Sequence, residues 1–143
     1  MSTPALTFEM TTPERPVLSR PADFVVLPAV DGEFGVLPGH SPFVVQLRAG
    51  ELRVRAGEET LHYAVSGGFA EVLDDRVAVF AETAEMAGDI DVERARLGLE
   101  KAKAALHGDG GDLSLSQAEA MMHREAARLR VASQHRRAGR GKG

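Results

Sequence analysis

The 143-residue sequence contains no cysteine and no tryptophan, and its aromatic residues are six phenylalanines and one tyrosine. Without cysteine, disulfide bonds and thiolate metal sites are excluded. No run of about 18 apolar residues is present, so we expect no segment that spans a bilayer. The first twenty residues carry Glu9 and Glu14 and lack an apolar block after a basic start, so we expect no secretory signal. Any association with a membrane is therefore expected to be indirect, through a partner.

The charge is distributed unevenly along the chain. Residues 1–87 carry six Lys or Arg and thirteen Asp or Glu, a balance of −7, whereas residues 88–143 carry eleven and eight, a balance of +3. This contrast indicates two units with different partners. A basic C-terminal part is typical of segments that meet nucleic acid or an acidic protein surface.

Residues 1–87 show the pattern of short strands. Leu6, Phe8 and Met10 alternate with polar residues, so one face of this segment is apolar. The continuous apolar run at 24–27 is typical of a strand that is buried on both faces. Further strand-like segments lie at 36–37, 43–45, 52–54, 61–65, 69–73 and 77–80, and Gly, Pro and Asp turns separate them. This spacing, with no helical pattern between the strands, predicts an antiparallel β-sandwich or barrel.

After residue 87 the apolar period changes to that of a helix. Asp91 stands at an N-cap position, and a stripe at spacings of three and four follows it. The stripe consists of Val92, Ala95, Leu99, Ala102 and Leu106. A Gly- and Asp-rich connector at 107–112 ends this helix.

A second amphipathic helix follows the connector. Its N-terminus is capped either by Ser114 with Gln117 or by Ser116 with Glu119. Its stripe consists of Leu115, Ala118, Met122, Ala126 and Leu129. Two helices joined by a short link pack as an antiparallel hairpin, and alanine-rich stripes bury little area, so we expect the hairpin to be weakly held.

The sequence therefore predicts a β plus α fold in two units. Residues 1–87 form an antiparallel β-sandwich, and residues 88–143 form an antiparallel two-helix hairpin with a basic tail. From Arg136 on, basic residues alternate with glycines, and we expect this tail to be disordered.

The most informative motif is the segment 31–42, DGEFGVLPGHSP. Two turns around a short strand explain its glycines and prolines but leave the purpose of His40 open. No second His, Cys or carboxylate stands at ligand spacing, so a metal site is not expected. The pair Gly67 and Gly68 has a structural interpretation, which is a β-bulge or a close approach between strands.

Four motifs, in register along the chain, resemble the epsilon subunit of bacterial F-type ATP synthases. They are TPER at 12–15, the segment 31–42, YAVSGGFAEV at 63–72 and IDVERA at 90–95. The resemblance covers about residues 6–100 and implies a non-catalytic, peripheral subunit at the cytoplasmic face of the bacterial cell membrane. It implies that 1–87 is a docking domain that binds the gamma subunit and the membrane rotor ring, with Glu33 facing the ring and His40 near gamma.

The resemblance also implies roles for the helical hairpin. Arg124, Arg128 and Arg130 give the second helix a basic face, which would meet acidic surface on the catalytic head subunits and restrain ATP hydrolysis. In some bacterial members the 90–95 motif binds ATP together with basic residues from both helices. Carried over, that set is Glu85, Ile90, Asp91, Arg94, Ala95, Lys101, Arg124 and Arg128. No cofactor is required on this interpretation, and ATP is a possible regulatory ligand.

Three other interpretations compete with this one. A capped helix start explains Asp91 without any nucleotide. A nucleic-acid-binding module using the basic tail lacks the aromatic residues on which bases stack, and a stand-alone ATP sensor lacks a phosphate-cradling glycine loop. An enzyme is disfavoured because Ser66-Gly67-Gly68 is not a nucleophile elbow, since Ala64 replaces the first glycine. No catalytic residue is proposed.

Overall fold

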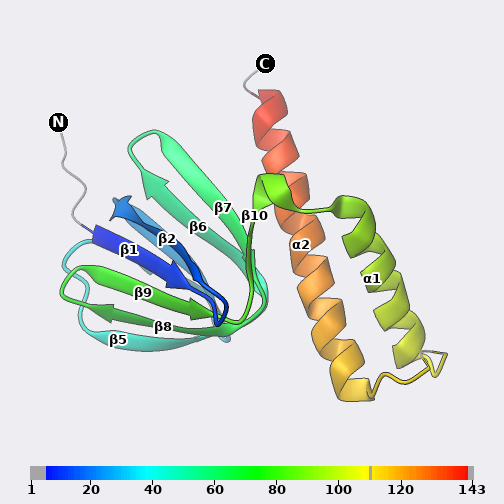
Figure 1. Ribbon diagram of the computed structural model, residues 1–143. Coiled ribbons are helices and arrows are strands. Elements are labelled where there is room, and N and C mark those ends of the chain that lie inside the picture. Colours follow the sequence, from blue (N-terminus) through cyan, green and yellow to red (C-terminus); the bar gives the residue numbers. More distant parts are fainter. Residues whose placement is uncertain (1–5, 110, 142–143) are drawn as a thin grey trace.

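A computed structural model describes residues 6–109 and 111–141 of the chain (Figure 1). Ten strands come first, then a 3₁₀ turn at Ala87–Asp89, then two α-helices. The strands are β1 Leu6–Thr11, β2 Pro16–Ala22, β3 Phe24–Ala29, β4 Gly32–Val36, β5 Phe43–Leu47, β6 Gly50–Ala56, β7 Glu59–Val65, β8 Gly68–Leu73, β9 Arg76–Ala81 and β10 Ala84–Met86. The helices are α1 Val92–Leu106 and α2 Leu115–Gly141.

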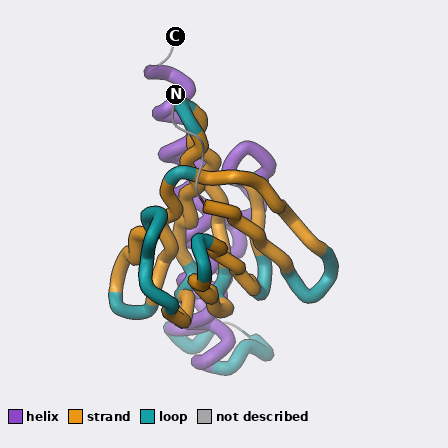
Figure 2. The backbone as a smooth tube through the Cα atoms, turned by 90° about the vertical axis from the view of Figure 1, so that its left-hand side faces the viewer, coloured by secondary structure: helices purple, strands orange, loops and turns teal. Residues whose placement is uncertain are grey.

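The strands form a single sheet that folds back on itself around one core. The strand order is β10-β7-β6-β3-β5-β8-β9-β1-β2, and β4 pairs with the free side of β3. One pair of residues, Ala29 and Leu47, joins β3 to β5, where the sheet turns from one layer to the other. An ion pair between Arg20 of β2 and Glu59 of β7, 3.5 Å long, spans the opening on the other side. Viewed from the side of the strands, the two layers lie in front and the helices behind them (Figure 2).

The alternation in the sequence correctly predicts which residues make the core. Leu6, Phe8 and Met10 of β1 are all buried, and so are Leu52 and Val54 of β6. The apolar run in β3 is buried from Val25 to Ala29, as expected for a strand covered on both faces. The predicted β plus α fold class is confirmed. Every buried residue of the main core comes from the strands, so the sandwich closes without the helices.

Two edge strands and one pairing direction were not predicted. β2 carries Pro16 and Pro21 and pairs with β1 alone among the described strands, so its missing N–H groups disrupt no inner ladder. β10 is three residues long and pairs with β7 at the other end of the sheet. The antiparallel sandwich has one exception that was not predicted, since β1 and β9 pair in parallel.

Both helices start at caps that the sequence predicts. The Asp91 carboxylate accepts a hydrogen bond from the Arg94 N–H at 3.1 Å. Of the two possible caps for α2, the structure uses Ser114, whose hydroxyl accepts from the Gln117 N–H at 3.1 Å while the Gln117 amide oxygen accepts from the Ser114 N–H at 3.0 Å. This reciprocal pair is a capping box. The helices then run antiparallel to each other, as predicted (Figure 1).

The hairpin packs beside β6, β7 and β10 through a small second apolar cluster. Its buried members are Ala64, Ala87, Ile90, Val131 and Ala132. The predicted stripe of α2 is only partly right, because Leu115 is exposed while Ala127, Val131 and Ala132 are buried. A helix lodged between α1 and a sheet needs two buried faces, and a single stripe describes one of them.

The backbone of α2 reaches into the C-terminal tail, whose predicted disorder stays a prediction. The backbone of α2 continues as a helix through Gly141, so 136–141 belong to the helix. Arginine is a good helix former, and no proline or capping motif ends the helix in this region. Residues 142 and 143 lie outside the described part of the chain.

Candidate functional site

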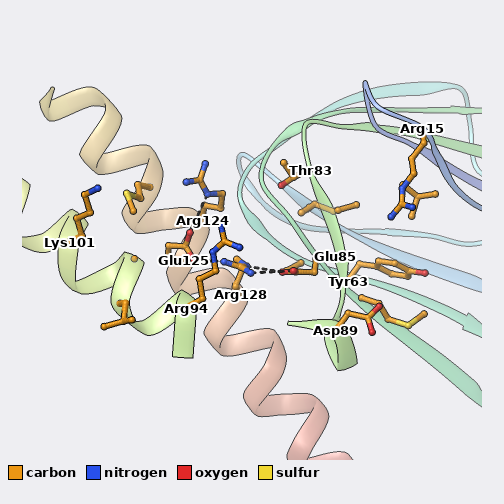
Figure 3. Close-up of a pocket in the computed structure, with 18 residues that line it drawn as sticks. Arg15, Tyr63, Thr83, Glu85, Asp89, Arg94, Lys101, Arg124, Glu125 and Arg128 are labelled. Carbon is orange, nitrogen blue, oxygen red and sulfur yellow. Dashed lines mark hydrogen bonds and ion pairs between the residues drawn. The ribbon is translucent and has the colours of Figure 1, made fainter. Parts of the chain in front are cut away.

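A cleft of about 990 Å³ lies between the sandwich and the hairpin (Figure 3). Strands β7 and β10 form one wall, and α1 and α2 form the other. The cleft collects charged side chains of both signs. Its cations are Arg15, Arg94, Lys101, Arg124 and Arg128, and its carboxylates are Glu85, Asp89 and Glu125. Five positive and three negative groups leave a net charge of +2, so the cleft favours an anion.

Arg128 lies at the centre of the cleft and is held by two carboxylates. Its Nε donates to Glu85 Oε1 at 2.7 Å, and its Nη2 donates to Glu85 Oε2 at 3.2 Å. Its Nη1 donates to Glu125 Oε2 at 2.8 Å. The hydrogen bonds to Glu85, followed by the one to Glu125, raise the pKa of Arg128, so its guanidinium stays charged. Because Glu85 belongs to β10 and Arg128 to α2, this contact also ties the hairpin to the sandwich.

Glu125 is the one buried charged residue in the described chain, with 6% of its surface exposed. Besides Arg128, its carboxylate meets the Nε of Arg124 at 3.5 Å. Gly98 of α1 makes room for it, since a Cβ at this position would lie 3.1 Å from both Cγ and Cδ of Glu125. The carboxylate thus fills the crossing of the two helices beside both arginines.

Arg94 and Lys101 of α1 form the other basic side of the cleft. Within residues 6–109 and 111–141, neither side chain takes part in an ion pair, in contrast to Arg124 and Arg128. In Figure 3, Arg94 lies close to Arg124 and Arg128, whereas Lys101 lies further along α1. These cations are therefore available to a ligand without breaking an existing contact.

Five of the eight residues in the predicted ATP set line this cleft. They are Glu85, Arg94, Lys101, Arg124 and Arg128. The other three serve the structure: Asp91 caps α1, Ile90 packs in the second apolar cluster, and Ala95 is fully buried. The structure thus brings together the charged members of the set other than Asp91, and ATP binding itself stays a prediction.

The predicted basic face of α2 is not one surface in this conformation. Arg124 and Arg128 both point into the cleft (Figure 3). Arg130 is exposed and stands two residues after Arg128, which places it about 200° further round the helix. The prediction that the three arginines share a face is therefore wrong.

The two predicted contact residues of the sandwich are both at its surface. Glu33 on β4 is exposed and pairs with Arg53 at 3.0 Å. His40 is half-buried, with its ring 5.3 Å from that of Phe34 and 6.5 Å from that of Phe43. A hydrogen bond of 2.7 Å from the Gly39 N–H to the Asp75 carboxylate fastens the loop that carries His40 to the β8–β9 turn.

An exposed apolar face on β5, β8 and β9 was not predicted. Phe69 and Phe80 are cross-strand partners whose rings stack at 5.0 Å, yet 49% and 42% of their surfaces are exposed. Val44 and Leu73 extend the same outer side and are also exposed. The signal was present in the sequence, because both phenylalanines fall on the outward positions of their strands, where polar residues are expected.

The described residues contain no group of three or more His, Asp or Glu side chains that could hold a metal ion. No helix among them is both long and apolar enough to cross a membrane.

Two protein-family models match the chain. One describes the β-sandwich domain of the ATP synthase delta/epsilon chain and matches residues 5–87, and the other describes the long α-helix domain of that chain and matches residues 89–133. The chain belongs to the ATP synthase delta/epsilon family. The resemblance to bacterial epsilon subunits is thereby confirmed, and membership makes the chain a non-catalytic subunit of the complex.

Curated bacterial relatives in this family are similar over most of their length. ATP synthase epsilon chains from Syntrophobacter fumaroxidans and Desulforamulus reducens are 48% and 44% identical over 124 residues, which is 87% of this chain and 92% and 94% of theirs. The epsilon chain of Anaeromyxobacter dehalogenans is 48% identical over 129 residues, which is 90% of this chain and 98% of its own.

Two solved structures share the fold. A chain of the Euglena gracilis mitochondrial ATP synthase, solved as OSCP/F1/c-ring in rotational state 1, superposes with a TM-score of 0.75 at 27% identity, covering 93% of this chain and 83% of that one. A chain of the Tetrahymena thermophila mitochondrial ATP synthase central stalk and c-ring gives 0.57 at 13% identity, covering 92% and 96%. At 13% identity this second similarity concerns the fold alone.

Proposed function

We propose that this epsilon-family subunit links the gamma subunit to the membrane rotor ring in the central stalk, and that its hairpin regulates the enzyme. The observation that carries the proposal is the division of surfaces between the two layers of the sandwich. The hairpin covers β6 and β7, whereas the aromatic face on β5, β8 and β9 is open. One subunit can therefore hold a permanent partner on one layer and a detachable arm on the other.

The aromatic face fits a permanent protein partner. Contiguous exposed apolar surface marks interaction sites, and aromatic residues are enriched in interfaces. Phe69 and Phe80 are already stacked on each other, so binding costs them little side-chain entropy, and Val44 lies on the same side of the sheet opposite Glu71. We assign this face to the gamma subunit.

We assign the ring contact to Glu33, which lies exposed on β4. The loop with His40, which the hydrogen bond between Gly39 and Asp75 holds in place, is assigned to the side near gamma. A charged side chain at such a surface provides orientation and specificity more than affinity. The subunit thereby lies at the cytoplasmic face of the membrane without entering it.

A regulatory role for ATP is supported by the cleft. Arg94, Lys101, Arg124 and Arg128 converge there from both helices. Arginine forks suit phosphate oxygens. A nucleotide bound to both helices and to the sandwich would stabilise the folded hairpin by mass action.

Gamma docking is tested by co-purification. The double change Phe69→Ser and Phe80→Ser should weaken binding to gamma at least about 30-fold, the effect of losing an interface hot spot of about 2 kcal/mol. Leu115→Ser, which changes an exposed apolar residue on the hairpin, is the matched control and should bind normally. Thermal melts confirm that each variant is folded. Undiminished binding by the phenylalanine variant would place the gamma interface elsewhere.

The same experiment separates the competing functions. A stalk subunit is recovered with gamma, whereas a nucleic-acid-binding module would be recovered with RNA and would lose it after nuclease treatment. A stand-alone ATP sensor would be recovered with neither.

A further inference from the structure

We propose that Glu125 is a resident anion that competes with polyphosphate for Arg124 and Arg128 and so sets the affinity of the cleft for nucleotide. The inference rests on the proposed regulatory role of ATP and specifies how this chain tunes it. Its starting point is the burial of Glu125, which no other part of the proposed function uses.

The geometry places the Glu125 carboxylate where a phosphate group would bind. It lies 2.8 Å from Arg128 Nη1 and 3.5 Å from Arg124 Nε. The opposite edge of Arg128 is occupied by both oxygens of Glu85. A guanidinium recognises phosphate through the same fork of N–H groups that recognises carboxylate. Arg128 therefore has carboxylates on both sides, and a ligand must displace one of them.

The packing shows that Glu125 is built into this position. Gly98 on the facing helix leaves the space that the side chain occupies, with 3.1 Å from a hypothetical Cβ to Glu125 Cγ. A buried carboxylate is costly unless it is paired and hydrogen-bonded, and both arginines fulfil that need. Removing the charge releases Arg124 and the Nη1 edge of Arg128, while Glu85 still holds the other edge, and no cavity opens provided that the shape of the side chain is kept.

The basic residues of α1 and those of α2 then have different roles in the cleft. Arg94 and Lys101 make no ion pair with any described residue and attract an incoming anion directly. Arg124 and Arg128 bind the anion only after it displaces the Glu125 carboxylate from them. The wild-type chain should therefore respond to higher nucleotide concentrations than the same chain without the Glu125 charge.

The test is isothermal titration of the full-length chain with MgATP and, separately, with inorganic triphosphate. Glu125→Gln keeps the shape of the side chain and should bind both probes roughly ten- to a hundredfold more tightly than wild type, the range for a hydrogen bond to a charged group. Tighter binding of MgATP alone would assign the site to the whole nucleotide rather than to polyphosphate, and would also support the role of Glu125. Glu119→Gln, an exposed change of the same net charge on α2, is the control and should bind like wild type.

Two further variants test whether a gain in affinity comes from loss of the Glu125 charge. Adding Arg124→Gln to Glu125→Gln should remove the gain in affinity, because the freed arginine is its source. If the melt of Glu125→Gln shows an unfolded hairpin, Glu125→Met, which also keeps the length of the side chain, provides a second measurement of the same charge removal.

The outcomes are distinct. Binding by Glu125→Gln with none by wild type supports the role of Glu125 and ends the regulatory role of ATP in the native chain. Equal binding by wild type and Glu125→Gln leaves the nucleotide site in place and overturns the role of Glu125. No binding by any variant overturns both, while gamma docking is judged separately by co-purification.

Discussion

Gly68, the first residue of β8, lies where β8 and β9 approach each other too closely for any other residue. Its φ is +125°, and a Cβ placed on it would overlap the carbonyl oxygen of Phe80 on β9. The interpretation as a close approach between strands is confirmed at Gly68, whereas a Cβ at Gly67 would meet only the Glu82 side chain, at 3.5 Å. Since Phe80 stacks on Phe69, this approach also shapes the aromatic face proposed for gamma.

Gly68→Ala is expected to destabilise the sandwich strongly. A non-glycine residue in this backbone region costs about 1–3 kcal/mol, and the overlap with the Phe80 carbonyl adds to it. We therefore expect a loss of at least about 2 kcal/mol in the free energy of unfolding, measured by urea denaturation. Gly57→Ala is the control, because Gly57 has a φ of +64° but open space around it. Equal losses for the two variants would show that backbone strain alone matters at Gly68.

Single residues also mark the limit of what the sequence predicts about the site. The basic residues of the cleft were found because they resemble a family set, and most of them do converge. Glu125 was missed, because a glutamate on a helix is ordinarily exposed and nothing in the sequence pairs it with Gly98 on another helix. Tyr63 lies in the predicted strand segment 61–65 and is buried, and this burial raises the pKa of its hydroxyl.

Among the elements, the regular ones were predictable and the edges were not. Inner strands bury alternate side chains, so their sequence period shows them. The edge strands β2 and β10 bury less and tolerate proline or very short length, and therefore lack that signal. The parallel pairing of β1 with β9 is set by the closure of the whole sheet, which no local period encodes.

The start of α2 offers a test at this scale. Ser114→Ala removes the side-chain half of the capping box and should cost about 1 kcal/mol of local helix stability. Hydrogen exchange of the amides at 115–118 should become about fivefold faster at that cost. Ser116→Ala removes the serine of the alternative cap and should leave exchange unchanged or slower, since alanine is the better helix former. Faster exchange in the Ser116 variant would mean that Ser116, and not Ser114, caps the helix in solution.

At the scale of the whole molecule, the sandwich and the hairpin differ in how firmly they are held. The sandwich has a core of its own, whereas the hairpin rests on five small or medium buried residues, of which Ile90 and Val131 are the largest. Burying side chains of this size contributes about 1.5–3 kcal/mol each. The contact of Glu85 with Arg128 adds a polar attachment, and the Gln134 amide, turned so that its nitrogen faces Glu51, would donate to that carboxylate at 2.6 Å. A competing interface can therefore detach the hairpin at moderate cost.

The last prediction concerns the hairpin as a brake on ATP hydrolysis. In the folded hairpin Arg128 is mostly buried and paired with Glu85 and Glu125, whereas Arg124 lines the cleft with 44% of its side chain exposed. Detaching the hairpin frees Arg128 from Glu85, so that both arginines can meet an acidic catalytic surface. Deleting residues 88–143 should raise hydrolysis by the purified complex, and the deletion should still assemble because the sandwich core contains no hairpin residue. Because the attraction is electrostatic, restraint by the full-length chain should weaken as salt rises.

A reversible disulfide cross-link that holds the hairpin folded against the sandwich tests the same prediction. The chain has no cysteine, so Ala64→Cys with Ala132→Cys, two buried members of the second apolar cluster, supplies a single pair of thiols, one on β7 and one on α2, for a disulfide. Oxidation should hold the hairpin folded and raise hydrolysis as much as the deletion does, and reduction should restore the brake. Each single-cysteine variant controls for the substitutions, and a non-reducing gel confirms the cross-link. Hydrolysis that is unchanged by both the deletion and the cross-link, at equal subunit occupancy and low salt, would show that the hairpin does not restrain this enzyme.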